Sequence, residues 1–305
     1  MKSTHKFIVL LSIVIVAGFF IKADNVTDNT EKAPIKTHNN TSPYYEIKAL
    51  KLPDHMEFAG ESAPLDDPDV HERIDRELLV NTYWQSNALL LFKRAHKFFP
   101  VIEPILAQKG VPDDFKYLAL IESGLQNVTS PSGAKGFWQI LKATAKEAHL
   151  EVNDNVDERY HLEKATEAAC DYLLKSHENF GSWSLAAAAY NAGNRRIREN
   201  MNTQKADNYY DLLLNDETAR YIPRILAVKE ILMHPSEYGF SFDEEDLYNL
   251  EPTYTVEVDT VINNMANFAM HFGMNYKELK RHNPWLREDH LNNKSRKKYY
   301  IKIKR

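Results

Sequence analysis

Hydrophobic positions recur with helical spacing through most of the chain. Between residues 71 and 245, apolar side chains return every three or four positions, which places them on one face of a helix. Glycines at 110, 124, 181 and 193 stand where helix ends favour a left-handed residue. The pattern therefore predicts an all-α domain over residues 71–245, with helices at 87–99, 113–123, 142–149, 162–180, 185–192 and 218–233.

The last 56 residues follow a different pattern, which predicts a second domain at 250–305. Residues 254–258 and 299–303 have the composition and alternation of strands, with Ile301 and Ile303 on the inner face and Lys302 and Lys304 on the outer face. Two short helical stretches, 262–272 and 275–282, lie between them. The order is β-α-α-β.

The N-terminus combines a basic start with a short apolar run. Lys2 and Lys6 precede residues 7–21, which span about 22 Å as a helix, less than a ~30 Å hydrocarbon core. We predict that residues 1–23 are a secretory signal peptide or a retained N-terminal anchor, and that residues 24–70 are a linker and irregular segment. We therefore expect an exported bacterial protein of the periplasm or cell envelope.

Composition narrows the functional classes. The chain has 305 residues, 43% of them hydrophobic, which suits a soluble protein of about two domains. Cys170 is the only cysteine, so an intramolecular disulfide and a cysteine-cluster metal site are excluded. The 12 histidines form no H-E-x-x-H motif, and we expect neither metal nor cofactor.

Charge is divided unevenly along the chain. Residues 253–305 carry 11 Lys and Arg against 5 Asp and Glu, whereas residues 24–252 carry 24 against 38. The overall net charge of −5 argues against nucleic-acid binding. The division itself indicates two modules with different surroundings.

Glu122 is the first candidate for chemistry. Phe115, Leu118, Ala119 and Glu122 share one face of the helix predicted at 113–123, and that face is otherwise apolar. Burial and the negative end of the helix dipole both disfavour a charged carboxylate there, which suits a general acid. The alternative is a glutamate that points to solvent or pairs with an arginine.

Two further segments have the residue types of a sugar site. Residues 130–140 are small and glycine-rich, then aromatic: Trp138 offers a flat apolar face, and Gln139 both donates and accepts hydrogen bonds. The alternative is a turn followed by core aromatics, which we favour for Phe137. Tyr190 and Asn191 end an alanine-rich helix where a cleft can open, or else they are a core tyrosine and a helix cap.

These motifs, taken in order, carry a family resemblance. E-S-G (122–124), S-P-S-G-A-K-G-F-W-Q-I (130–140) and A-Y-N-A-G (189–193) resemble the lysozyme-like lytic transglycosylases, and are closest to the membrane-bound lytic murein transglycosylase D group. Residues 156–159 and 217–224 agree with this. The resemblance implies a lysozyme-like fold, with Glu122 as catalytic acid and Ser130, Gln139, Tyr190, Asn191 and Tyr221 at the substrate. We interpret residues 157–159 as structural, a cap and an ion pair.

The implied reaction is cleavage of the β-1,4 bond between N-acetylmuramic acid and N-acetylglucosamine, with a 1,6-anhydro product. These motifs offer one placed carboxylate, so the substrate's own C6 hydroxyl is expected to act as nucleophile, whereas ordinary glycosidases use two carboxylates. Two alternatives stay open: a lysozyme-type hydrolase of the same fold, and a non-catalytic wall-binding protein.

The C-terminal module resembles a LysM glycan-binding domain, in divergent form, on Y-T-V (254–256) and K-E-L-K-R-H-N-P (277–284). We expect the protein to be a monomer and its binding partner to be the glycan strands of peptidoglycan. The basic C-terminus, or the N-terminus, offers the further alternative of contact with a membrane surface. Deleting residues 253–305 is expected to weaken wall binding and to spare cleavage of soluble fragments.

Overall fold

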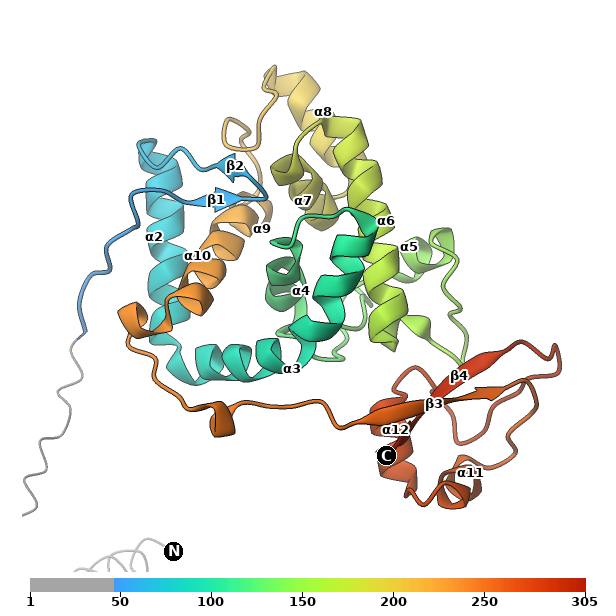
Figure 1. Ribbon diagram of the computed structural model, residues 1–305. Helices are drawn as coiled ribbons and strands as arrows, with labels where there is room; N and C mark the ends of the chain where they lie inside the picture. The colour runs from blue at the N-terminus through green and yellow to red at the C-terminus, as the bar shows by residue number, and fades with distance from the viewer. Residues whose placement is uncertain (1–46) are drawn as a thin grey trace, which may run out of the picture. The chain divides into compact units, whose positions relative to one another are not determined.

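The computed structural model describes residues 47–305, so the predicted signal or anchor at 1–23 and the first part of the predicted linker lie outside it. Within the described part, a helical domain is followed by a small module with a two-stranded sheet (Figure 1). The expected fold class, mainly α with a β-α-α-β unit, is confirmed. No helix of residues 47–305 is long and apolar enough to cross a membrane.

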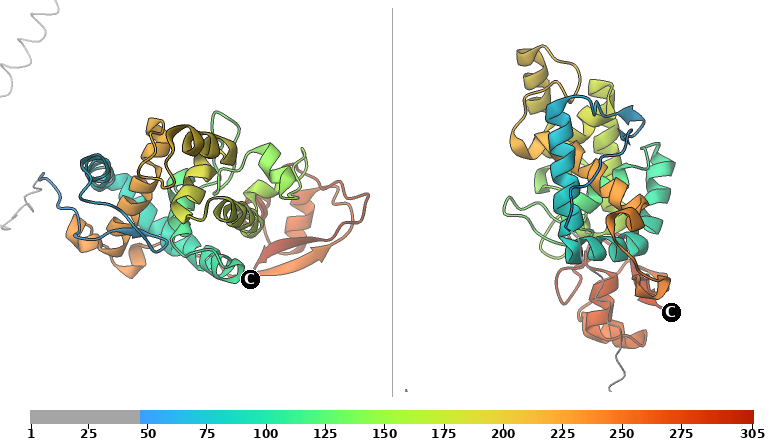
Figure 2. Two further views of the ribbon diagram at one scale, coloured as in Figure 1. Left: turned by 90° about the horizontal axis from the view of Figure 1, so that it is seen from above. Right: turned by 90° about the vertical axis from the view of Figure 1, so that its left-hand side faces the viewer.

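The helical domain is built around α10, which contacts α2, α4 and α7, while α6 packs against α3 and α7. Figure 2 shows the same packing from two further directions. The alanine run of α7 is fully buried, which allows close approach of its neighbours. The elements are β1 Glu57–Phe58, β2 Glu61–Ser62, α2 Pro68–Tyr83, α3 Gln85–Lys109, α4 Phe115–Ser123, α5 Lys142–Glu147, η1 Glu158–Tyr160, α6 Leu162–Phe180, α7 Trp183–Ala192, α8 Asn194–Gln204, α9 Asp216–Ala219, α10 Tyr221–Met233, η2 Pro235–Tyr238 and η3 Glu244–Asp246.

In the helical domain, two predicted helices differ from the structure by more than a two-residue shift at an end. The helix expected to end at residue 99 continues through Pro100 and Pro104 to Lys109, with a bend that Figure 1 shows midway along α3. A proline removes one helical hydrogen bond, but Ile102 and Leu106 are completely buried, and their packing outweighs that loss. The helix predicted at 218–233 is divided at Arg220 into α9 and α10.

The segment before α2 contributes to the core, although its sequence predicts an irregular segment. Residues 57–62 form the β1–β2 hairpin, and Phe58 is fully buried against Phe115, with ring centroids 4.9 Å apart. The alternation is too short to be recognised in the sequence, because each strand has two residues.

The C-terminal module has the predicted element order. It consists of β3 Thr253–Val258, α11 Met265–His271, α12 Tyr276–His282 and β4 Tyr299–Lys304, with β3 antiparallel to β4. Ile301 and Ile303 are fully buried, as the alternation predicts. On the opposite face of the strand, Lys304 is exposed, whereas Lys302 is half-buried.

Candidate active site

The ends of α4 and α7 and the loop between α4 and α5 surround a cavity of about 380 Å³. Five of the six predicted site residues line it: Glu122, Ser130, Gln139, Tyr190 and Asn191. The sixth, Tyr221, is buried at the start of α10 and its hydroxyl donates a hydrogen bond to Oε1 of Glu122. Residues separated by 99 positions in the chain are thus brought into one site.

Glu122 occupies the last turn of α4, on the face shared with Phe115, Leu118 and Ala119, all of which are fully buried as predicted. Burial raises the pKa of Glu122 to about 7. The hydrogen bond from Tyr221 lowers the pKa and the nearby charge of Glu217 raises it, while Arg224 lowers it. The carboxyl therefore changes protonation near neutral pH, as a proton donor and acceptor requires.

α4 is held in place from both ends. Asp114 accepts hydrogen bonds from Nζ of Lys229 and from the backbone N–H of Ala59, both at 2.7 Å, which ties α4 to α10 and to the β1–β2 hairpin. At the other end, the Ser123 hydroxyl donates to the carbonyl of Phe137 at 2.8 Å. This contact joins the turn after Glu122 to the loop whose Ser130 and Gln139 line the cavity.

Tyr221 is positioned by a buried carboxylate. Glu77 of α2 is 1% exposed and accepts from Nε of Arg220 at 2.7 Å and from Nε of Arg224 at 3.3 Å. The hydroxyl of Tyr209 donates to the carbonyls of Thr218 and Ala219 at 2.8 and 2.9 Å, which secures the α9–α10 junction. A charge buried with its partners is costly to disturb, so this cluster fixes the start of α10.

The loop at 130–140 lies against residues 157–160. Gly136 has φ +79°, and a Cβ there would lie 2.0 Å from the carbonyl oxygen of Arg159, so only glycine fits. The Arg159 guanidinium donates to the carbonyls of Gly133 and Ile140 at 3.2 and 3.3 Å. Asp157 accepts from Nε and Nη2 of Arg159 at 2.9 and 2.8 Å and caps η1. The predicted cap and ion pair are confirmed.

Gln139 sits in this loop with a left-handed backbone, φ +47°, which is uncommon for a residue with a side chain. Its Nε2 donates to the carbonyls of Gly136 at 2.8 Å and Val128 at 3.2 Å. Ser130 accepts from the N–H of Ala134 at 3.1 Å, and its Oγ lies 2.9 Å from that of Ser132. Both side chains are therefore fixed at the cavity wall before a ligand arrives.

Trp138 does not offer a face to a sugar, and that interpretation of the sequence is wrong. Its ring is fully buried, with Nε1 donating to the hydroxyl of Thr166 at 2.8 Å. Phe137 is also in the core, as favoured, with its ring 4.8 Å from that of Phe98. Tyr190 combines both interpretations: it lines the cavity, and its hydroxyl donates to the Trp138 carbonyl at 2.6 Å.

The structure also brings a second carboxylate to the cavity, which sequence reasoning missed. Glu217 lines the same cavity as Glu122 and is exposed. Its Oε1 accepts from Nδ2 of Asn191 at 3.2 Å, and Oδ1 of Asn191 accepts from the Thr218 hydroxyl at 2.7 Å. Glu217 lies in a motif already noted at 217–224, but nothing in its spacing predicts that it lines the same cavity as Glu122.

Among the described residues, no group of three metal-ligating side chains lies in this cavity. Within residues 47–305, the one grouping of three such side chains is Glu288, Asp289 and His290 in the C-terminal module, and the two acids are exposed. What the cavity offers is one desolvated carboxyl, one exposed carboxylate and several fixed hydrogen-bonding groups.

Comparison with known families identifies both parts of the chain. Residues 100–213 match the transglycosylase SLT domain, and residues 254–304 match the soluble lytic transglycosylase C-terminal LysM-like domain. The chain thus contains a lysozyme-like SLT domain followed by a LysM-like domain.

Two relatives are similar in sequence. They are the membrane-bound lytic murein transglycosylase D proteins of Escherichia coli K12 and of E. coli O6:H1, each 28% identical over 198 residues. The match covers 62% of this chain and 43% of each relative, so the chain spans less than half of their length. A crystal structure of an inactive mutant of the lytic transglycosylase Slt from Pseudomonas aeruginosa aligns at 19% identity and a TM-score of 0.38, covering 49% of this chain and 26% of that one.

Proposed function

We propose that this chain, an SLT transglycosylase domain joined to a LysM-like domain, is a peptidoglycan lytic transglycosylase with Glu122 as its acid and base. The observation that carries the proposal is the state of Glu122. Glu122 faces a cavity, and no cation of residues 47–305 forms an ion pair with its carboxyl. Its pKa of about 7 leaves a large protonated fraction at neutral pH. Such a carboxyl can give up a proton and take one back within a single reaction.

In the proposed reaction, protonated Glu122 donates its proton to the oxygen of the β-1,4 bond between N-acetylmuramic acid and N-acetylglucosamine. The C1–O bond breaks and the leaving sugar departs as an alcohol. The C6 hydroxyl of the muramic residue then attacks its own C1, and the Glu122 carboxylate takes the hydroxyl proton. The product is a 1,6-anhydro sugar, and no water is consumed. An intramolecular attack is favoured because the nucleophile is already held beside C1.

Tyr221 and Gln139 have separate tasks in this scheme. The Tyr221 hydroxyl bonds Oε1 of Glu122, which leaves Oε2 for the glycosidic oxygen. Since both amide hydrogens of Gln139 go to backbone carbonyls, its Oε1 can accept from a sugar hydroxyl or amide. Ser130, Tyr190 and Asn191 complete the lining and are proposed to contact or enclose the glycan.

Glu217 makes hydrolysis a second candidate. An exposed carboxylate in the same cavity can act as a general base on water, with Glu122 as the acid, as in inverting glycosidases. Digestion of purified peptidoglycan followed by mass spectrometry separates the two reactions, because the anhydro product is lighter by one water than the reducing-end product.

The Glu217→Gln variant makes the test sharper. A transglycosylase keeps most of its activity without Glu217, whereas a hydrolase that uses it as base loses about 10²–10⁴-fold. A mass spectrum with only reducing ends, together with an inactive Glu217→Gln, would replace transglycosylation by hydrolysis. A folded wild-type chain that cleaves no glycan would leave wall binding as the function.

The LysM-like module and the expected export both fit a wall substrate. We propose peptidoglycan strands as the ligand of the module and the bacterial cell envelope, periplasm included, as the location. A pull-down of the full chain with insoluble peptidoglycan, compared at low and physiological salt, tests whether the module binds peptidoglycan strands. Sequencing the N-terminus of the secreted protein tests whether residues 1–23 are removed.

A further inference from the structure

The C-terminal module and the helical domain share a hydrophobic core. Val156 and Tyr160, from the segment before α6, are 1% and 5% exposed and belong to the same cluster as Trp285, Leu286 and Tyr299 of the module. The Arg287 guanidinium lies 4.2 Å from the centroid of the Tyr160 ring. These contacts are those of a domain interior, not of a flexible tether.

Backbone hydrogen bonds cross the same boundary. The N–H of Asp157 donates to the carbonyl of Trp285 and that of Arg287 to the carbonyl of Asn155, both at 2.9 Å, so Val156 and Leu286 pair as an antiparallel bridge. The Asn155 side chain adds two bonds: its Oδ1 accepts from the N–H of Asn292 at 2.8 Å, and its Nδ2 donates to the carbonyl of His290 at 2.9 Å.

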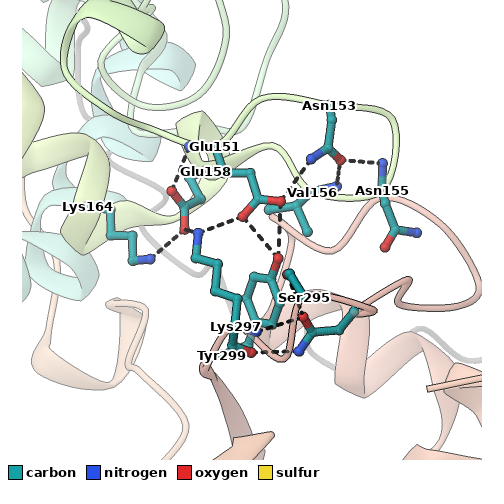
Figure 3. Close-up of polar contacts among 10 residues, drawn as sticks. Glu151, Asn153, Asn155, Val156, Glu158, Lys164, Ser295, Lys297 and Tyr299 are labelled. Atoms are coloured by element: carbon teal, nitrogen blue, oxygen red, sulfur yellow. Dashed lines mark hydrogen bonds and ion pairs between the residues drawn. The ribbon is translucent and has the colours of Figure 1, made fainter. Parts of the chain in front are cut away.

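Charged side chains complete the boundary, as Figure 3 shows around Glu151. Nζ of Lys297 lies 2.6 Å from Oε2 of Glu151 and 3.7 Å from Oε1 of Glu158. The Tyr299 hydroxyl donates to both oxygens of Glu151 at 3.0 and 3.1 Å. Lys302 pairs with Glu163. Lys297 and Lys302, two cations of the basic C-terminal module, are thus matched to acids of the helical domain.

The segment held by the module is the one that supports the cavity loop. Asp157 donates its N–H to Trp285 while its carboxylate holds Arg159, and Arg159 in turn holds the carbonyls of Gly133 and Ile140. Ser130 and Gln139 of that loop line the cavity. Two steps therefore connect the module to the substrate wall: module to residues 155–160, and residues 155–160 to residues 130–140.

We propose that the C-terminal module is a brace for the active-site loop, with Lys297 and Glu151 as positioning residues at its boundary. Loss of the boundary releases residues 155–160 and then the 130–140 loop. Cleavage of a soluble glycan therefore depends on the module, even when wall attachment plays no part. This reverses the expectation that deleting residues 253–305 spares soluble substrates.

The test uses the full chain and two variants that differ in severity. Val156→Asp places a carboxylate in the shared core, and Lys297→Glu reverses the cation that meets Glu151. Lys298→Glu is the matched control: it carries the same charge change one residue away, but Lys298 pairs with Glu257 inside the module. The double variant Glu151→Lys with Lys297→Glu restores an opposite-charge pair across the boundary.

Amide hydrogen exchange provides a readout that needs no substrate. The N–H groups of Asp157 and Arg287 report the boundary, and those of Lys135, Gly136 and Ile140, all bonded within the loop region, report the loop. We expect Lys297→Glu to speed exchange at both sets by about tenfold or more, since a hydrogen bond to a charged group contributes roughly that factor. Lys298→Glu should leave both sets as in wild type, and the charge swap should restore protection.

Kinetics on a soluble glycan fragment add a second readout, which rests on the proposed function. Loosening of the loop should raise KM more than it lowers kcat, because Glu122 and Tyr221 lie outside the braced segments. An inactive wild-type chain would reject the proposed function and leave the exchange test in force. Fast exchange at Asp157 and Arg287 with an unchanged loop would overturn the brace. So would an intact boundary in Val156→Asp, because the shared core would then not hold it.

Discussion

Two desolvated carboxylates in this chain have opposite pKa shifts. Burial raises the pKa of Glu122 in the cavity to about 7. Burial also disfavours the charge of Glu163 at the module boundary, but His161, whose Nδ1 lies 3.2 Å from Oε2, and Lys302, which pairs with Oε1, hold its pKa at about 2. The difference lies in the direct partners. The neutral phenol of Tyr221 bonds Glu122, while the charges of Glu217 and Arg224 act on it from nearby in opposite directions. Lys302 pairs directly with Glu163, beside the imidazole of His161.

This contrast separates a reactive carboxyl from a structural one. At Glu163 the protein supplies a positive charge that stabilises the ionised form, and the result is a firm contact between two domains. At Glu122 no cation of the described residues forms an ion pair with the carboxyl, and Arg224 acts only through its nearby charge. Burial therefore costs stability at neutral pH and leaves a group that exchanges protons.

The largest effect is expected from Glu122→Gln. Glutamine keeps the shape and the bond with Tyr221 but has no proton to give, so the rate of glycan cleavage should fall by about 10²–10⁴-fold or more. Cleavage rate is measured on purified peptidoglycan, and circular dichroism establishes that the fold is retained. Glu72→Gln, an exposed change on α2, is the control. Near-wild-type cleavage by folded Glu122→Gln would remove this residue from the mechanism.

Replacing Tyr221 by phenylalanine should have the next largest effect on activity. The hydroxyl lowers the pKa of Glu122, so Tyr221→Phe should raise that pKa further and free the carboxyl to rotate. Loss of a hydrogen bond to a charged group is worth about 1.5–3 kcal/mol, so kcat should fall roughly 10- to 100-fold. The pH profile is the decisive measurement, because a purely structural role for Tyr221 would leave its alkaline limb in place.

Stability should change in opposite directions when the two carboxylates are removed. The raised pKa of Glu122 does not change the free energy of unfolding below the unfolded pKa near 4.3, but it lowers that free energy by about 3 kcal/mol at pH 7. Glu122→Gln should therefore be more stable than wild type at pH 7 and equally stable at pH 4. Because the pKa of Glu163 is lower in the folded than in the unfolded chain, its charge stabilises the fold above the unfolded pKa. This stabilisation is lost as pH falls through about 2. Glu163→Gln should therefore lose about 2–3 kcal/mol at pH 7.

Urea unfolding of wild type and both variants at pH 4 and pH 7 measures this pair of shifts. The same sign for both variants at pH 7 would show that partners do not distinguish the two carboxylates. A Glu122→Gln protein that is less stable at pH 7 than at pH 4, relative to wild type, would make Glu122 a structural ion-pair residue.

The pH dependence of cleavage should follow the charge near Glu122. Activity requires the protonated acid, so it should decline as pH rises through about 7. Glu217 raises that pKa, so Glu217→Gln should move the decline to lower pH while leaving the maximum rate of a transglycosylase nearly unchanged. An unshifted profile would mean that the two carboxylates do not interact.

An exposed ion pair should show the smallest effect. Arg195 and Glu199 on α8 are 3.6 Å apart, with side chains 92% and 64% exposed. Arg195→Ala should change the free energy of unfolding by about 0.5 kcal/mol or less, since water competes for both charges. A loss comparable to that of Glu163→Gln would mean that burial is not what gives the boundary pair its strength.

The sequence alone determined which faces of the helices and strands are buried and which motifs line the cavity. The spacing of Phe115, Leu118, Ala119 and Glu122 was enough to place a carboxyl on a buried face, and alternation was enough to orient Ile301 and Ile303. Such patterns are local: one turn of helix or two residues of strand decide which side is covered, whatever lies opposite. The motif order likewise located five cavity-lining residues.

What lies opposite was decided only by the tertiary structure. Tyr221 meets Glu122 across 99 residues, Arg220 meets Glu77 across 143, and Lys297 meets Glu151 across 146. The periodicity of the sequence carries no information about such distant pairs. The sequence therefore did not place Glu217 in the site, predicted that Trp138 faces the ligand, and predicted a C-terminal module that acts independently. The pKa of a buried carboxyl depends on these distant partners, because in a desolvated site the nearest charge or donor determines which protonation state is favoured.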